Sequence, residues 1–164
     1  NSKKFYKRVL ELRNIGAFKS SNKSDCRLSG INSRLDNIQA IILNEKLKKL
    51  NYLNKKRKSI SRRYEKELNN SKISKLEYEP GAVYHQYVIK TNNRNKFLNY
   101  LAKRKIEYGI HYPISINNLK IIKKENKKKF PNAEKLARQC VSIPIDPLLK
   151  KEQITKIINV INSY

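Results

Sequence analysis

The chain of 164 residues contains no methionine and no tryptophan, only two cysteines and only four glycines. Without methionine, Asn1 is not an encoded start, so we expect either N-terminal processing or the downstream piece of a longer chain. Cys26 and Cys140 are too few for a disulfide framework and lack metal-ligand spacing, so we expect free thiols in a reducing compartment. Four glycines in the whole chain argue against a glycine-rich phosphate loop.

The chain also lacks a long hydrophobic run. No apolar stretch approaches the roughly 18 residues that a membrane-spanning helix needs, and the N-terminus does not resemble a signal peptide. Hydrophobic residues nevertheless make up 38% of the chain and recur periodically, which argues against disorder. We therefore expect a soluble, cytoplasmic protein with a real core and no membrane partner.

Acidic residues are scarce, with 13 Asp and Glu against 38 Lys and Arg, and the formal net charge is +25. A basic protein that binds nucleic acid is one open interpretation. The basic residues, however, occur in every segment instead of one stripe, and they accompany the asparagine and isoleucine that A+T-rich coding favours. The densest run, Lys120–Phe130, has no interleaved aromatic residues to stack on bases. We favour a solvated surface whose charge follows from the overall composition. The nucleic-acid interpretation predicts that the protein stays bound to DNA or RNA near physiological salt.

The first half of the chain has helical patterns. Lys3–Leu12 predicts a short helix, and Arg13–Gly30 predicts a loop. The spacing then predicts a helix over Ser33–Leu68 in which apolar residues recur every three or four positions as one continuous buried stripe. Ser33 and Asp36 resemble a capping box at its start. At 1.5 Å per residue this helix would be roughly 50 Å long, which is typical of a helix that bridges two domains or subunits.

The second half predicts a small α/β module. Strands are expected at Ala82–Thr91 and Ile106–Tyr112, and a short extended segment at Val141–Ile145. Amphipathic patterns predict helices over Asn93–Lys105, Pro131–Cys140 and Leu149–Tyr164.

A candidate anion site lies where the long helix is expected to begin, in the stretch "SGINSRLDNIQAIIL" (Ser29–Leu43). A helix N-terminus has free N–H groups and a partial positive charge. Asn32 adds an amide donor, and Arg34 adds a guanidinium suited to bidentate binding of an oxyanion. An ordinary helix cap and a solvated arginine would explain the same residues, so both interpretations stay open.

The two histidines, His85 and His111, both fall in predicted strands beside tyrosines. Because no cysteine or carboxylate cluster lies near them in the sequence, they make a poor metal site, and we expect no metal. Lone histidines in strands are more typical of a structural role than of catalysis.

Five motifs in register resemble the C-terminal motifs of the DegT/DnrJ family of pyridoxal-phosphate-dependent nucleotide-sugar aminotransferases. They read "SGINSRLDNIQAIILNEKL", "VYHQYVI", "GIHYPISIN", "FPNAEKLARQCVSIPI" and "PLLKKEQI", and the match extends from Leu12–Ala17 to the end of the chain. The resemblance implies an α/β fold, namely the C-terminal small domain and long interdomain helix of the aspartate-aminotransferase-like (fold type I) transferases. Residues 1–32 would then end the large cofactor domain and form an interface loop, 33–69 would form the connecting helix, and 70–164 the small domain.

The resemblance also implies a homodimer with shared active sites. Asn32 matches the position that contacts the phosphate of the partner subunit's pyridoxal 5′-phosphate, and Arg34 matches a position suited to substrate anionic groups. His111 and Tyr112 belong to the "HYP" segment near the sugar pocket and become expected substrate contacts. For His85, whose family role is less defined, we expect core packing.

For the complete protein the resemblance implies transfer of an amino group from glutamate to a nucleotide-linked keto sugar, for cell-surface polysaccharide or related amino-sugar biosynthesis. The Schiff-base lysine is expected upstream, so this chain alone would be inactive and contains no catalytic residue of its own. Ser115 and Asn117 make "PISIN" depart from the commoner "PIPLH", which leaves the sugar and nucleotide open, and the "HYP" form favours a 3-keto over a 4-keto sugar. A family member without catalysis that acts as a regulator is a further alternative.

Overall fold

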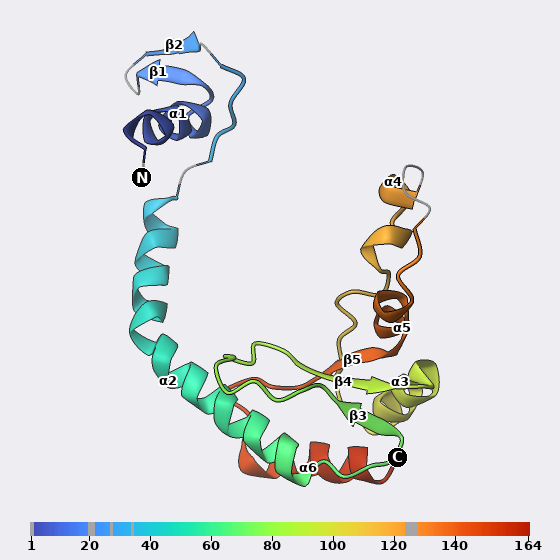
Figure 1. Cartoon of the computed structure of the whole chain (residues 1–164). Helices are drawn as coiled ribbons and strands as arrows, with labels where there is room; N and C mark the ends of the chain where they lie inside the picture. Colours follow the sequence, from blue (N-terminus) through green and yellow to red (C-terminus); the bar gives the residue numbers. More distant parts are fainter. Residues whose placement is uncertain (1, 20–21, 27, 34, 124–127) are drawn as a thin grey trace. The chain divides into compact units, whose positions relative to one another are not determined.

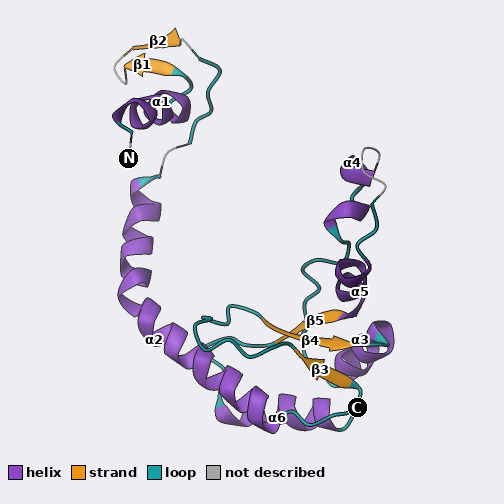
Figure 2. Cartoon of the chain, viewed as in Figure 1, coloured by secondary structure: helices purple, strands orange, loops and turns teal. Residues whose placement is uncertain are grey.

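The computed structural model of the chain describes residues 2–19, 22–26, 28–33, 35–123 and 128–164. Two compact units are present, Asn1–Lys49 and Leu50–Tyr164. Figure 1 follows the chain through both units, and Figure 2 shows that helices predominate beside short strands. The predicted α/β class is confirmed. Within the described ranges, no helix is long and apolar enough to cross a membrane.

The first unit contains a helix and a hairpin. Helix α1 covers Lys3–Arg13, and the side chain of Ser2 accepts a hydrogen bond from the Phe5 N–H at its start. Strands β1 (Ala17–Lys19) and β2 (Asn22–Cys26) then pair antiparallel. The prediction of a loop over Arg13–Gly30 was therefore wrong in part. The strands are short and largely polar, so the sequence has no period-two apolar signal that would reveal them.

Helix α2 covers Asn37–Glu67 and begins later than predicted. The Ile31 N–H donates to the Leu12 carbonyl and the Ser33 N–H donates to the Arg13 carbonyl, each at 2.9 Å. These bonds hold the backbone beside the end of α1 as far as Ser33, so Ser33 is not the helix cap and the predicted capping box was wrong.

The predicted apolar stripe on α2 is buried only near its C-terminal end. Ile60 and Tyr64 are buried, as is Leu68 just beyond the helix. In the N-terminal half, by contrast, Ile38 is 73% exposed and Leu47 is 65% exposed. The expectation of a continuous buried stripe was therefore wrong for this chain by itself. A periodic apolar pattern reports a need for burial, but it does not say which chain covers the residues.

The second unit is built on a three-stranded antiparallel sheet of order β3-β4-β5. The strands are β3 (Ile73–Lys75), β4 (Tyr87–Thr91) and β5 (Cys140–Ile143). The predicted strand over Ala82–Thr91 starts only at Tyr87, because the preceding backbone turns at Tyr84, which has a φ of 51°.

The predicted strand over Ile106–Tyr112 was wrong. Its pairing is limited to one bridge, in which Gly109 and Ser142 exchange backbone hydrogen bonds of 2.9 and 2.8 Å. Ile106 is buried in the core, but Tyr108 and Tyr112 are both exposed, so only the first residue of the alternating pattern is covered and the segment does not become a strand.

Helices surround the sheet. The three predicted helices are confirmed as α3 (Arg94–Lys103), α5 (Pro131–Gln139) and α6 (Lys151–Asn162). A 3₁₀ turn, η1 (Ile116–Asn118), and a single helical turn, α4 (Lys120–Lys123), were not predicted. Residues 124–127 of the basic run lie outside the described residues.

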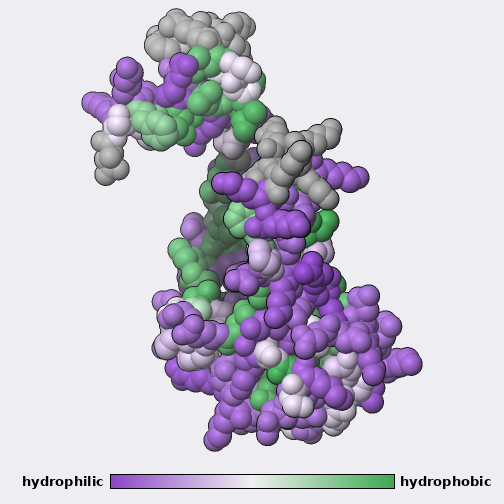
Figure 3. All heavy atoms as spheres, turned by 45° about the vertical axis from the view of Figure 1, so that its right-hand side comes forward, coloured by the Kyte–Doolittle hydropathy of each residue, from purple (hydrophilic) through white to green (hydrophobic). Residues whose placement is uncertain are grey.

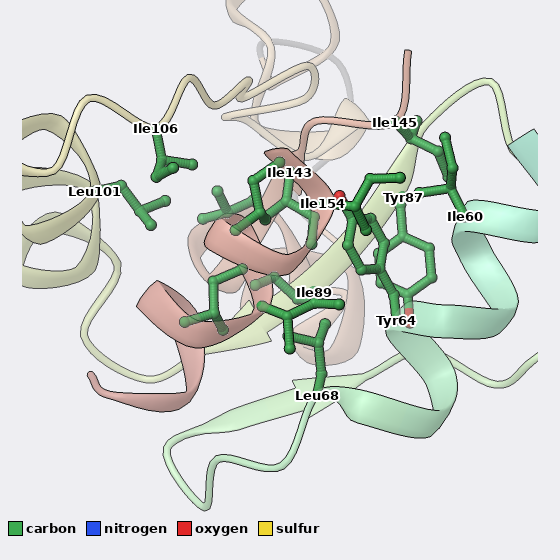
Figure 4. Packing of buried hydrophobic residues seen from close by; sticks show 14 of the residues in the cluster. Ile60, Tyr64, Leu68, Tyr87, Ile89, Leu101, Ile106, Ile143, Ile145 and Ile154 are labelled. Atoms are coloured by element: carbon green, nitrogen blue, oxygen red, sulfur yellow. The ribbon is translucent and has the colours of Figure 1, made fainter. Parts of the chain in front are cut away.

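One face of the sheet packs into a core with the end of α2, α3 and α6. Figure 4 shows Ile60 and Tyr64 of α2 beside Tyr87 of β4, with Ile143 and Ile154 from β5 and α6 in the same cluster. Burial alternates along β4, so Tyr87, Ile89 and Thr91 face the core, whereas Val88 and Lys90 face the opposite side. The visible surface of this unit in Figure 3 is largely hydrophilic, with small apolar patches.

Candidate functional site

The loop that carries Asn32 is tightly fixed to the end of α1. A Cβ on Gly16, whose φ is +79°, would lie 1.8 Å from the Leu28 carbonyl oxygen. A Cβ on Gly30 would lie 2.3 Å from the backbone nitrogen of Gly16. Both positions therefore require glycine, because the two backbone segments are in direct contact. Asn32 forms an isolated bridge with Asn14 in this arrangement.

The side chain of Asn32 remains exposed on this fixed loop. A carboxamide offers two N–H donors. Helix α2, which begins five residues later, has Asp36 immediately before it and no acidic residue within its first turn. This donor set fits an anionic group such as a phosphate brought by another molecule. Arg34, the second predicted residue of this site, lies outside the described residues.

His111 and Tyr112 line a cavity of about 720 Å³ on the side of the sheet away from the core. Both side chains are exposed, Tyr112 to 79%. The cavity is mainly apolar, and its aliphatic and aromatic lining includes Val88, Ile110, Ile114, Ile116, Phe130 and Leu136.

Ser115 and Asn117 line the same cavity and are buried. The Asn117 amide donates to Glu134 Oε1 at 2.9 Å, and the Asn118 amide donates to Ser115 Oγ at 2.9 Å. The first bond joins η1 to α5 and the second closes the η1 turn, so the two residues that depart from the common family motif stabilise the cavity wall.

Cys140 is a free, half-buried thiol on this cavity. Burial raises the pKa of Cys140, although the nearby cations of Lys90 and Arg94 oppose the change. The side chain of Cys26 lies outside what the structure describes. No group of three or more His, Cys, Asp or Glu residues that could hold a metal occurs in the described part of the chain.

Both histidines line a second pocket of about 430 Å³, here called the histidine pocket. His85 is exposed there, so the expectation of core packing was wrong. The pocket also contains Arg57 from α2, Glu107 from the segment after α3, and Asp146 from the segment after β5. Sequence reasoning missed these three, because no local pattern links residues so far apart in the chain.

Comparison with known proteins confirms the family resemblance over nearly the whole chain. The family model described as the DegT/DnrJ/EryC1/StrS aminotransferase family matches residues 1–162. The dTDP-3-amino-3,6-dideoxy-alpha-D-galactopyranose transaminase of Aneurinibacillus thermoaerophilus is 32% identical, over 100% of this chain and 45% of its own length. The UDP-N-acetyl-3-dehydro-alpha-D-glucosamine 3-aminotransferase of Acidithiobacillus ferrooxidans is 31% identical, over 92% of this chain and 40% of its own.

Solved structures agree with these relatives. DesV from S. venezuelae, crystallised in complex with a ketimine intermediate, is 28% identical with a TM-score of 0.87, over 99% of this chain and 44% of that chain. An aminotransferase from Brucella abortus is also 28% identical, with a TM-score of 0.85 and the same coverage of 99% and 44%. The chain thus spans less than half the length of the proteins to which it is similar.

Proposed function

Because the chain belongs to the DegT/DnrJ/EryC1/StrS aminotransferase family, we propose that it is part of a cytoplasmic, pyridoxal-phosphate-dependent enzyme that moves an amino group from glutamate to a nucleotide-linked keto sugar. The names of two relatives carry this proposal, since both describe amino transfer at carbon 3 of a nucleotide-linked sugar. They support a 3-keto substrate and a place in amino-sugar or polysaccharide biosynthesis.

The residues of this chain have binding roles in the proposal. Pyridoxal phosphate would supply the electron sink when it is bound, and the proposal assigns no lysine of this chain to hold it. Asn32 donates its amide hydrogens to the cofactor phosphate in the partner's site, and Arg34 provides a cation for anionic groups of the substrate. His111 and Tyr112 hydrogen-bond to the sugar. In this arrangement residues 1–32 end the large domain, residues 33–69 form the helix that connects the two domains, and residues 70–164 form the small domain.

A homodimer with shared active sites is part of the proposal. The exposed apolar surface of this chain needs cover from the rest of the proposed large domain, from a second subunit, or from both. Among the described residues up to Lys49, Ala17 is the only buried hydrophobic side chain. Ile38 and Leu47 lie on roughly opposite sides of α2, at about 100° of rotation per residue, and both are exposed. A helix with apolar residues on several sides is stable in water only when other protein surfaces pack against those sides.

The test is to express the complete coding region that contains this chain, load the protein with pyridoxal phosphate, and add glutamate with a dTDP-linked 3-keto-6-deoxy sugar. Mass spectrometry should detect the amino sugar together with 2-oxoglutarate. No amino sugar from either the 3-keto or the 4-keto isomer would overturn the proposal, whereas product from the 4-keto isomer alone would overturn only the sugar position.

The role of Asn32 is tested separately by cofactor retention. Asn32→Ala should lose pyridoxal phosphate faster on dialysis, followed by its absorbance, than the matched control Ser33→Ala, which changes an exposed neighbour on the same loop. Equal retention in both variants would count against a phosphate contact.

A further inference from the structure

We infer that His85 is a substrate-binding residue, and that the histidine pocket which it shares with His111 and Arg57 binds the sugar-phosphate part of a nucleotide sugar. The identity of this ligand rests on the proposed function. His85 has no assigned role, and its position beside a strand favoured simple packing.

The first observation is convergence. The chain has two histidines in 164 residues, and both line one pocket of about 430 Å³, a volume typical of a small-molecule site. Five separate segments supply its polar groups, namely α2, the loop before β4, the segment after α3, β5 and the segment after β5. All of them belong to the unit Leu50–Tyr164, so the lining comes from one compact body.

The second observation is a strained backbone immediately before His85. Tyr84 has a φ of 51°, a left-handed conformation that a bulky residue rarely adopts. Its hydroxyl donates to the Glu79 carbonyl at 2.8 Å and accepts from the Glu79 N–H at 2.9 Å. Its ring also stacks on Tyr78, with centroids 5.5 Å apart.

These contacts hold a conformation that would otherwise relax. Their effect is that Tyr87 enters the core while His85, two residues earlier, stays exposed in the pocket. A strained conformation of this kind persists where several surrounding contacts fix it, and such residues are common at ligand-binding sites.

The third observation concerns His111. A Cβ on Gly109 would lie 2.9 Å from His111 Nε2, so the imidazole occupies the space that the missing side chain leaves. The backbone of Gly109 is in turn fixed to β5 by its two hydrogen bonds with Ser142. Both imidazoles are therefore carried by backbone that the sheet or its adjoining loop holds in place, which is the arrangement of a preorganised site.

The chemistry of the lining selects the ligand. The Arg57 guanidinium suits phosphoryl oxygens. Imidazole nitrogens and the carboxylates of Glu107 and Asp146 suit sugar hydroxyls, because they accept or exchange hydrogen bonds with them. A ligand that combines phosphate with hydroxyl groups uses all of these side chains, and a nucleotide sugar is such a ligand.

The test uses the complete protein, in which His85→Gln and His111→Gln each remove one imidazole Cε1–H signal and so assign it. The probes are dTDP-glucose and UDP-N-acetylglucosamine, which are stable nucleotide sugars. We expect at least one probe to shift both signals along one saturation curve. A shift of His111 alone, or of neither histidine, would overturn the inference.

Variants give the second readout. His85→Ala should weaken binding of the nucleotide sugar about fivefold to tenfold, the equivalent of one lost hydrogen bond, without changing the circular-dichroism melting temperature, because His85 is exposed. The matched control is Val83→Ala, an exposed position in the same loop outside the pocket, which should bind like the wild type. Equal affinity in the two variants would overturn the inference.

The two proposals can fail separately. If the complete enzyme aminates a keto sugar but His85→Ala leaves its KM for that sugar unchanged, the function stands and the role of His85 is wrong. If no sugar is aminated although nucleotide sugars shift both imidazole signals, the pocket assignment stands and the reaction is wrong.

Discussion

At the scale of single residues, Tyr64 shows how one side chain joins distant parts of the chain. Its ring is fully buried and meets Tyr87 edge-on, with centroids 5.0 Å apart. Its hydroxyl donates to the Pro144 carbonyl at 2.7 Å. Burial raises the pKa of Tyr64 far above its ordinary value, so the hydroxyl keeps its proton and remains a donor.

Tyr64→Phe should therefore lower the free energy of unfolding by about 1–2 kcal/mol, because the Pro144 carbonyl loses its donor in a part-buried position. Urea unfolding followed by circular dichroism measures this change. The control is Tyr52→Phe on the same helix, where the ring is 59% exposed and little change is expected. Equal stability of the two variants would show that the hydroxyl contributes nothing.

Gly30 is a second position where one residue decides local structure. Gly30→Ala would bring a Cβ within 2.5 Å of the Leu12 carbonyl oxygen, and backbone atoms on both sides leave no room to adjust. We expect faster hydrogen exchange at the Ile31 and Ser33 amides, about tenfold for each 1.4 kcal/mol lost from the contact with α1.

Gly81→Ala is the matched control, because the nearest atom to its new Cβ is the flexible Glu79 Oε1 at 3.3 Å. Its exchange pattern at Leu28–Ser33 should match that of the wild type. If Gly30→Ala does too, the loop that presents Asn32 is not held by this contact.

At the scale of elements, helices were predictable where the signal was local. Pro131 at the first turn marks α5, and the Ile154, Ile157 and Ile161 spacing marks α6. The start of α2 was not predictable, since hydrogen bonds from the end of α1 set it. The start of β4 depended likewise on the hydrogen bonds between Tyr84 and Glu79, which the alternating apolar pattern does not reveal.

The candidate site was also predictable only in part. Its family motifs were readable because they are contiguous, and the family assignment is confirmed. The roles of Asn32, Arg34, His111 and Tyr112 remain predictions. The histidine pocket was missed because α2, two loops and the end of β5 must fold together before Arg57, His85 and Asp146 meet.

Helix α5 and turn η1 are joined by a titratable contact. Glu134 Oε1 accepts from the Asn117 amide at 2.9 Å and from the Phe130 N–H at 3.2 Å. The hydrogen bond from Asn117, followed by that from Phe130, lowers the pKa of Glu134 below its ordinary 4.5. Since the folded state favours the carboxylate, this stabilisation is present at neutral pH and is lost as the pH falls through the lowered pKa.

An acid titration by NMR should therefore move the Asn117 side-chain amide and the Phe130 amide together, with a midpoint below 4.5. Glu134→Gln keeps a carbonyl acceptor but does not titrate, so the same signals should stay in place. A midpoint at or above 4.5 in the wild type would contradict the contact.

At the scale of the whole molecule, apolar surface is distributed unequally. The unit Leu50–Tyr164 has a core of sixteen buried hydrophobic residues. In the described part of the other unit, large side chains such as Phe5, Ile38 and Leu47 are exposed. Forty-nine residues with so little burial are too few to be stable alone, so this surface needs cover from the rest of the proposed large domain, from a second subunit, or from both.

If a second copy covers this surface, Leu47→Glu should weaken self-association by roughly 100-fold or more, because an unpaired carboxylate would be buried in the interface. The control is Ser59→Glu, which introduces the same charge at an exposed polar position on the same helix, about 120° around from Leu47. Light scattering of the complete protein after size exclusion should give the wild type and the control twice the mass of one subunit, and Leu47→Glu the mass of one. A wild-type monomer at all concentrations, or a dimer in both variants, would show that another partner covers α2.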